Sequence, residues 1–360
     1  GKLSLDDDIT KFFPDYPTHG HTITLHHLLT HTSGIKSYTG MEEWLSEWRT
    51  DFTDEELIDF FKYQPMDFAP GEEFRYNNSA FFMLGPIIEK ASGLSYARFL
   101  DSLIFKPLGM KNSSYGSKTR LIHNRAVGYQ KEGNGFKNAE FLSMTQPGAA
   151  GAIMSTVDDM FLWSQAIRNN TLVKKETIDK AFTNHTLNNG EKINYGYGWG
   201  TNEINGSPTL EHSGGIFGYT SNGIYLPEEN VYLIALTNRD DKSPRTITTR
   251  MAAMAIGKPF PDHEEKVEVP EEVLSSYTGV YDFEDGSTRY ITFEDGQLYS
   301  QRSGSMLIKI FPQSETRFFY AESMATITFG ENEEGQTTAR FEIRIDKTSG
   351  VKTDKPLPQH

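Results

Sequence analysis

A segment rich in proline and acidic residues divides the chain into two parts whose residue patterns differ. This segment, KPFPDHEEKVEVP at residues 258–270, has neither a helical nor a strand period and is typical of a linker. At 360 residues the chain is also too long for one ordinary core, which favours two domains. We therefore expect one domain over residues 1–257, a linker over 258–270 and a second domain over 271–360.

The first part reads as helices followed by strands. Thr53 and the glutamate three residues later form a capping-box pattern before an amphipathic run, and a second helical run ends at Gly93. A third helix should end at Pro107, and a fourth should begin after a cap at Ser155 or Thr156.

Strand patterns dominate the rest of the first part. The run SNGIYLPEENVYLIALTN indicates a hairpin that turns at residues 227–230, and PRTITTRMAAMAIG at 244–257 reads as a closing helix. Helices that gather first and antiparallel strands that follow indicate an α+β domain.

The second part consists of short aromatic and β-branched runs separated by turn signals. Asp-Gly at 285–286 and 295–296 and Glu-Gly at 334–335 mark three of the turns. Short strands at regular spacing predict a small antiparallel barrel or sandwich. The runs are YTGVYDF, RYITF, QLYSQR, LIKIFP, RFFYA, ATITFG and ARFEIRI.

Composition narrows the classes of partner. A net charge of −14 argues against nucleic acid and against anionic membrane surfaces, both of which attract basic patches. Because the chain has no cysteine, it can hold no disulfide, thiolate zinc site or cysteine nucleophile. We find no run of about 18 or more apolar residues and no signal peptide, so we expect no membrane span in these residues. The charge says little about a small-molecule or peptide substrate, and the oligomeric state stays open.

Five of the ten histidines lie within HGHTITLHHLLTH at residues 19–31. His27 and His31 are four residues apart and would share one face of a helix. A zinc protease motif at this spacing also needs a glutamate base between the histidines, and none is present. The surrounding apolar residues and a helix cap at Thr24 favour a structural role. We therefore expect neither a metal nor a cofactor here.

Seven segments of the first part occur in the order found in one family of hydrolases. They are GKLSLDDDITKFFPDYP, LLTHTSGI, FRYNNSAFFMLGPIIEKASG, LSYARFLDSLIFKPLGM, AAGAIMSTVDDMFLW, YGYGWG and LEHSGGIFGY. Together they resemble the serine β-lactamase-like family, which includes class C β-lactamases, penicillin-binding carboxypeptidases and related esterases. Residues 271–360 resemble the lipocalin-like barrel often appended to these hydrolases. The resemblance implies an α+β fold, a β-lactamase/transpeptidase-like domain of helices around an antiparallel sheet, followed by a small all-β barrel.

The resemblance also implies a catalytic role for the segment that begins at Tyr76. Tyr76-Asn77-Asn78 matches the Tyr-x-Asn motif of the family. It implies that Tyr76 is the general base or proton shuttle, because a phenol beside a lysine ammonium loses its proton more easily. It further implies that Asn78 hydrogen-bonds the lysine and the substrate.

A second motif stands where the family has Lys-Thr-Gly or a His-x-Gly variant. His212-Ser213-Gly214-Gly215 implies that His212 orients Tyr76 or the substrate, and that its charge depends on pH. Gly214 would let the substrate lie close to the strand edge, and Ser213 is expected among the residues that bind it. The backbone N–H of Gly215 would form half of the oxyanion hole. We expect both motifs to meet in one cleft.

The third family motif, Ser-x-x-Lys on a helix, has no good match. Ser33 and Lys36 flank a glycine, and Ser349 and Lys352 lie in a strand region of the second part. Without a helix, a serine and a lysine at this spacing do not stack on one face. We therefore expect the nucleophile and its lysine to lie in residues outside this chain, so that the chain alone does not turn over substrate.

The activity that the resemblance implies is that of a serine hydrolase. Such an enzyme would act through an acyl-enzyme on a small ester, an amide or a D-amino-acid peptide. His212 in place of lysine favours an esterase or peptidase over an efficient β-lactamase. The alternative is a catalytically inactive binding or regulatory protein on the same fold. A periplasmic or secreted location fits the family and the lack of cysteine.

Overall fold

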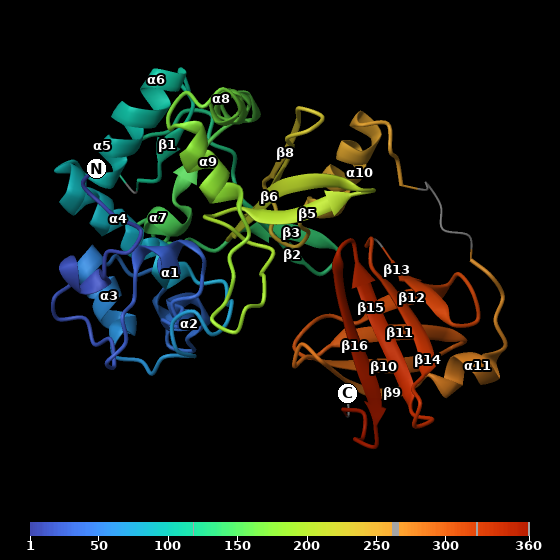
Figure 1. The fold of residues 1–360 in the computed structure, drawn as a ribbon. Helices are drawn as coiled ribbons and strands as arrows, with labels where there is room; N and C mark the ends of the chain where they lie inside the picture. Colours follow the sequence, from blue (N-terminus) through green and yellow to red (C-terminus); the bar gives the residue numbers. More distant parts are fainter. Residues whose placement is uncertain (118, 261–265, 322, 359–360) are drawn as a thin grey trace. The chain divides into compact units, whose positions relative to one another are not determined.

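The chain forms two compact units, each with its own packing (Figure 1). The computed structural model describes residues 1–117, 119–260, 266–321 and 323–358. The first unit is Gly1–Thr201 with Ser207–Thr248, and the second is Asn202–Gly206 with Thr249–His360. The predicted linker lies partly outside the described residues, at 261–265, and its described parts form neither helix nor strand. No helix in the described ranges has the length and apolar character needed to cross a membrane.

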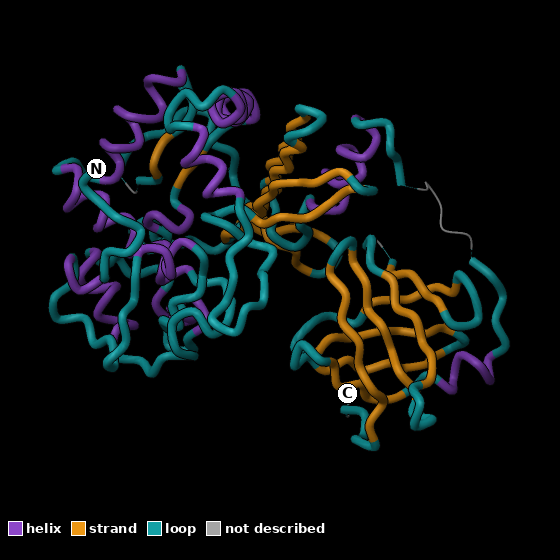
Figure 2. Tube along the Cα trace, viewed as in Figure 1, coloured by secondary structure: helices purple, strands orange, loops and turns teal. Residues whose placement is uncertain are grey.

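The first unit is built around α4 (Asn78–Ser92), against which α1, α3, α5 and α7 pack. Figure 2 shows the helical segments of the chain in purple. A π-helical turn at Asp101–Phe105 connects α5 with α6. The other α-helices before the linker are α1 (Leu25–Leu29), α2 (Trp44–Glu47), α3 (Asp54–Lys62), α5 (Tyr96–Leu100), α6 (Lys106–Leu108), α7 (Gly148–Gly151), α8 (Val157–Arg168), α9 (Lys175–Phe182) and α10 (Arg245–Ala255).

Local sequence explains where these helices begin and end. The capping box predicted before α3 is confirmed, because Thr53 and Glu56 each accept a hydrogen bond from the other's backbone N–H. Helix α4 stops at Gly93, which takes a left-handed φ of 77°. The cap of α8 is Thr156, one of the two predicted residues.

The expectation that Pro107 ends a helix is wrong. Pro107 lies in the first turn of α6, where a backbone N–H has no intrahelical partner and proline costs little. The helix ends two residues later at Gly109, whose φ is 73°. The π-helical turn before α6 lets the chain continue through the proline.

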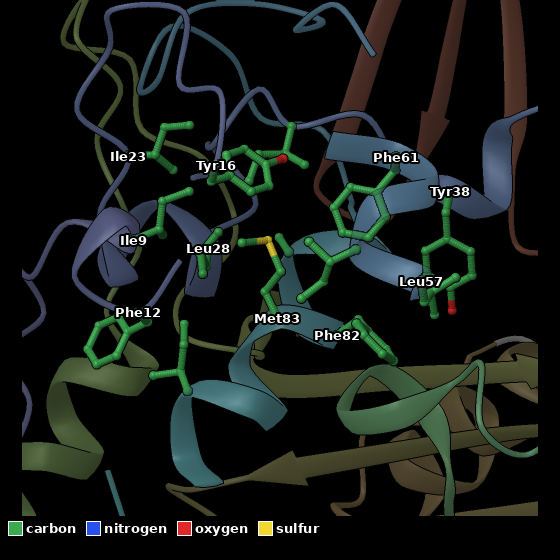
Figure 3. Packing of buried hydrophobic residues seen from close by; sticks show 14 of the residues in the cluster. Ile9, Phe12, Tyr16, Ile23, Leu28, Tyr38, Leu57, Phe61, Phe82 and Met83 are labelled. Atoms are coloured by element: carbon green, nitrogen blue, oxygen red, sulfur yellow. The ribbon is translucent and has the colours of Figure 1, made fainter. Parts of the chain in front are cut away.

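Helices and N-terminal turns share one hydrophobic core. Figure 3 shows side chains of α3 and α4 pointing toward those of the segment from residue 9 to residue 28. Met83 and Leu28 are fully buried there, and Phe61 and Phe82 are nearly so. Burial of this apolar surface holds α1, and the residues that follow it, against the start of α4.

An antiparallel sheet completes the first part of the chain. Its strands are β5 (Gly200–Ile204), β6 (Ser207–Ile216), β7 (Tyr219–Leu226) and β8 (Val231–Thr237), in the order β5-β6-β7-β8. The β7–β8 hairpin turns where it was predicted, and Asn230 in the turn has a left-handed φ of 56°. Two small sheets pair β1 (Ser114–Tyr115) with β4 (Ile153–Met154) and β2 (Tyr129–Glu132) with β3 (Gly135–Asn138).

The C-terminal strands form a closed antiparallel barrel, which confirms the predicted all-β fold. Each strand pairs with the next along the chain, and the last closes on the first. The turn at 295–296 joins β10 and β11 through two residues of positive φ, as the Asp-Gly signal predicts. A short helix, α11 (Glu271–Ser276), precedes the barrel. The strands are β9 (Gly279–Phe283), β10 (Thr288–Glu294), β11 (Gln297–Arg302), β12 (Ile308–Pro312), β13 (Arg317–Tyr320), β14 (Thr326–Glu331), β15 (Thr337–Ile343) and β16 (Asp346–Thr353).

Candidate active site

Tyr76 and His212 lie next to each other although 136 positions separate them in the sequence. Their ring centroids are 5.9 Å apart. His31, just after α1, brings its ring centroid to 4.2 Å from that of Tyr76. Tyr195, in the loop before β5, lies between His31 and His212 and hydrogen-bonds both. Four residues from four different segments therefore form one side-chain cluster.

The backbone around Tyr76 is fixed by His31. The N–H of Arg75 donates to the carbonyl oxygen of His31 at 3.0 Å, and the N–H of Asn77 donates to Nδ1 of its ring, also at 3.0 Å. The Asn77 side chain caps α4 by accepting from Ala80, so the residue after Tyr76 is held from both sides. His31 itself is 1 % exposed. These bonds set where Tyr76 stands at the entrance of α4.

Both ring nitrogens of His212 have partners. Nε2 lies 3.1 Å from the Tyr195 hydroxyl, and Nδ1 lies 2.7 Å from the carbonyl oxygen of Ser213. The Tyr195 hydroxyl also lies 3.2 Å from Nε2 of His31. His212 therefore contacts Tyr76 ring to ring, in a tilted arrangement, while its hydrogen bonds go to Tyr195 and to its own strand.

Burial keeps the two histidines of the cluster neutral. Desolvation, with a smaller effect of His212, lowers the pKa of His31 to about 3. Desolvation and the positive charge of Arg245 lower the pKa of His212, against the effect of its bond to Ser213. A neutral imidazole donates one hydrogen bond and accepts one, which matches the single contact that each ring nitrogen of His31 and His212 makes.

The hydroxyl of Tyr76 is available to a ligand. Among the described residues it has no hydrogen-bond partner, and the side chain is 48 % exposed. Burial of the ring raises the pKa of the Tyr76 phenol, so deprotonation at neutral pH needs a nearby cation. Asn78 begins α4, and its side-chain amide donates to the Thr39 hydroxyl at 2.9 Å.

The strand that follows His212 exposes its backbone. Ser213, Gly214 and Gly215 are all exposed. A Cβ on Gly214 would stand 2.5 Å from the Ser221 hydroxyl oxygen on β7, so a side chain there would have to displace that hydroxyl. A Cβ on Gly215 would meet nothing. This stretch can receive an extended ligand along the strand.

Neither formal Ser-x-x-Lys match lies on a helix. Ser33 is 1 % exposed in the turn after α1, and Lys36 is paired with Asp67 at 2.9 Å. Ser349 and Lys352 lie in β16 of the barrel. Residues three apart in a strand point to opposite faces, so Ser349 and Lys352 do not share a face.

The other histidines of the N-terminal run have separate tasks. His27 accepts the backbone N–H of Thr24 on Nδ1, which completes the capping box of α1. His26 bonds the Tyr197 hydroxyl at 2.7 Å and His185 at 2.9 Å. Within the described part of the chain, no three histidine, aspartate or glutamate side chains gather in a way that could hold a metal ion.

No sequence motif predicts that His31 and Tyr195 belong to this cluster. Both stand in segments that carried the family resemblance, His31 in LLTHTSGI and Tyr195 in YGYGWG. The contact itself depends on tertiary folding that brings together residues 164 positions apart, which no local pattern encodes.

Comparison with known proteins agrees with this architecture. Residues 1–257 match the family model described as beta-lactamase, and residues 263–352 match a domain of unknown function, DUF3471. Penicillin-binding protein 4* of Bacillus subtilis (strain 168) is 30 % identical over 358 residues, which cover 91 % of this chain and 77 % of that protein. Protein flp of Staphylococcus aureus (strain MRSA252) is 28 % identical over 66 % of this chain and 48 % of its own length.

Two solved structures extend the likeness. An octameric penicillin-binding protein homologue from Pyrococcus abyssi superposes with a TM-score of 0.66 at 26 % identity, covering 97 % of this chain and 83 % of that one. D-amino acid amidase from Ochrobactrum anthropi SV3, complexed with L-phenylalanine amide, gives a TM-score of 0.61 at 25 % identity and covers 72 % and 78 %. With a family match over residues 1–257 and a relative that aligns along most of the chain, this protein belongs to the beta-lactamase family.

Proposed function

We propose that this chain carries most of the catalytic domain of a serine hydrolase. Its substrate is a small ester, amide or D-amino-acid peptide, and the reaction passes through an acyl-enzyme. The observation that carries the proposal is the meeting of Tyr76, its hydroxyl without a partner, with the exposed strand His212–Gly215. The D-amino acid amidase among the structural neighbours supports D-amino-acid amides as the substrates to test first.

The site has the parts that acyl transfer needs, except the nucleophile. Tyr76 offers a phenol that can pass a proton to and from a serine hydroxyl or a leaving group. The open backbone at Ser213–Gly215 offers N–H donors for a carbonyl oxygen that becomes negatively charged. In this proposal the serine, and the lysine cation that would lower the pKa of Tyr76, come from residues outside the 360; the proposal is supported by the absence of a helix at both Ser-x-x-Lys matches in the chain.

The experiment compares this chain with a longer one encoded by the same reading frame and carrying an upstream Ser-x-x-Lys helix. Both are assayed with p-nitrophenyl acetate, D-phenylalanine amide and a D-Ala-D-Ala peptide. We expect hydrolysis only from the longer chain, with a covalent mass increase on its serine. If a longer chain with Ser-x-x-Lys in place hydrolyses none of these, or if the reading frame encodes no such helix, the proposal is wrong and the fold serves binding instead.

The role of Tyr76 is tested in the active longer chain. Tyr76→Phe removes only the hydroxyl, so kcat should fall about 100-fold or more if this group transfers the proton. Tyr63→Phe is a matched control, because Tyr63 is an exposed tyrosine at the end of α3 and should leave kcat unchanged. Full activity of Tyr76→Phe would remove the proton-transfer role while leaving the family and the nucleophile intact.

A further inference from the structure

The hydrogen bonds of the cluster can have their protons in only one order. The backbone N–H of Asn77 must donate, so Nδ1 of His31 is an acceptor and carries no proton. A neutral His31 therefore has its proton on Nε2 and donates it to the Tyr195 oxygen at 3.2 Å. This amide fixes one end of the series, and the carbonyl oxygen of Ser213, which can only accept, fixes the other end at Nδ1 of His212.

Tyr195 transmits this direction to His212. Its oxygen accepts from His31, so its own O–H donates to Nε2 of His212 at 3.1 Å. Nε2 of His212 then carries no proton, and the proton sits on Nδ1. From there it is donated to the carbonyl oxygen of Ser213 at 2.7 Å. In each of the four hydrogen bonds from Asn77 to Ser213, one group donates a proton and the other accepts it.

From this geometry we propose that His31 and Tyr195 are positioning residues that hold His212 in one neutral tautomer, with the proton on Nδ1, and fix it beside Tyr76. His31 does this for both sides of the site, because its backbone and its ring also hold the segment that carries Tyr76. The importance of this arrangement for hydrolysis rests on the proposed function, whereas the tautomer itself does not.

The arrangement assigns His212 a specific task. Its two ring nitrogens are occupied by the Tyr195 hydroxyl and by the Ser213 carbonyl oxygen. The ring therefore links strand β6 to Tyr195 and does not bind the substrate through a nitrogen. Protonation of Nε2 would turn this acceptor into a donor facing the Tyr195 hydroxyl and would break the order of bonds. The groups that bear on its charge are Tyr195, Tyr76, His31 and Arg245.

Histidine NMR on the 360-residue chain tests the proposal without any hydrolytic activity. Two-bond ¹H–¹⁵N spectra of histidine-labelled protein report which ring nitrogen carries the proton, and His31→Gln and His212→Gln assign the signals. At pH 7 we expect the proton on Nδ1 in His212 and on Nε2 in His31. A wild-type His212 with its proton on Nε2, or a mixture of both forms, would overturn the proposal.

The variant Tyr195→Phe removes the hydroxyl that links the two histidines. His212 should then show both tautomers and become protonated at higher pH than in the wild type, because a donor to its neutral form is gone. Tyr197→Phe is the matched control, since Tyr197 lies two residues away and its hydroxyl bonds His26. It should change the signals of His26 and of His185, which His26 contacts, and leave those of His212 unchanged. Equal His212 signals in both variants would contradict the proposal.

The two proposals fail separately. In the active longer chain, Tyr195→Phe should lower kcat/KM about tenfold, the equivalent of one hydrogen bond, and move the acidic limb of its pH profile to higher pH. If the longer chain hydrolyses nothing while His212 shows the expected tautomer, the hydrolase assignment is wrong and the positioning pair stands. If Tyr195→Phe does not fold, the wild-type tautomer measurement decides alone.

Discussion

His31 occupies a strained backbone position that its contacts must maintain. Its φ is 57°, a left-handed conformation that costs a histidine on the order of 1 kcal/mol. Its ring lies against Tyr76 and Phe81, with centroids 4.2 and 4.6 Å away, and its carbonyl oxygen and both ring nitrogens have partners. Loss of this one side chain would leave the Asn77 N–H without its acceptor in a buried place.

Stability should fall in acid because His31 is buried in its neutral form. Its pKa is about 3 in the folded state and 6.5 in the unfolded reference, so the unfolded state binds more protons between these values. This contribution is complete above pH 6.5 and is lost as the pH falls toward 3. At pH 5 the loss amounts to roughly 2 kcal/mol. Urea unfolding at pH 7 and pH 5 measures it.

Two variants isolate this effect. His31→Gln loses the contacts of the imidazole ring, so its free energy of unfolding should be lower than that of the wild type at pH 7. Because glutamine does not titrate, this free energy should also change less between pH 7 and pH 5. His19→Gln replaces an exposed histidine of the same run and should follow the wild type. Parallel pH dependences of all three proteins would show that His31 contributes nothing.

Helix boundaries were more predictable than the placement of helices against each other. The signals at Thr53, Gly93 and Thr156 are local, because a side chain or a glycine satisfies the backbone of its own turn. Helix α9 was missed because Lys174 gives it no side-chain cap and only Ile178 is buried in it. The family resemblance predicted that Tyr76 and His212 meet, and the structure places them side by side. Only the folded chain shows that Tyr195 joins His31 to His212.

The start of α4 should be the most sensitive helix cap of the chain. The Asn77 side chain accepts from Ala80 and donates to the Ile35 carbonyl oxygen, and the residue is 4 % exposed. Asn77→Ala removes the cap and leaves two buried groups unpaired, so we expect a loss of about 2–4 kcal/mol.

A second cap provides the comparison. Thr53→Ala removes the exposed cap of α3, where water replaces the lost bonds, and should cost about 1 kcal/mol. Urea unfolding of both variants gives the two values. Equal losses would show that burial of the α4 cap does not matter.

At the level of the whole molecule, periodicity in the sequence predicted an all-β region after a mixed region. The alternation of buried and exposed residues in the C-terminal strands is local information, as are the Asp-Gly turns. Closure into a barrel was one of two alternatives, because a barrel and a sandwich share the same strand pattern. The β9–β16 pairing decides between them, and it joins residues about 70 positions apart.

The linker between the two parts should be the first site of proteolysis. Residues 258–260 and 266–270 form neither helix nor strand, and those between them lie outside the described residues. Limited trypsin or Glu-C digestion should therefore cut near residues 258–272 and release a C-terminal fragment. The purified fragment should keep β-sheet circular dichroism and unfold in one cooperative step. Resistance of the linker, or an unfolded fragment, would contradict two separately folding domains.

The closure of the barrel also dictates when it can form during synthesis. Each of the strands from β9 to β15 can pair with the one made just after it, but β9 finds its second neighbour only in β16. Until the ribosome has released the last strand, β9 presents a free edge to other chains. The final step is therefore a long-range contact, which is slow to form because its ends must first be brought together. A chain that stops before Asp346 would keep both edges open and would be expected to aggregate.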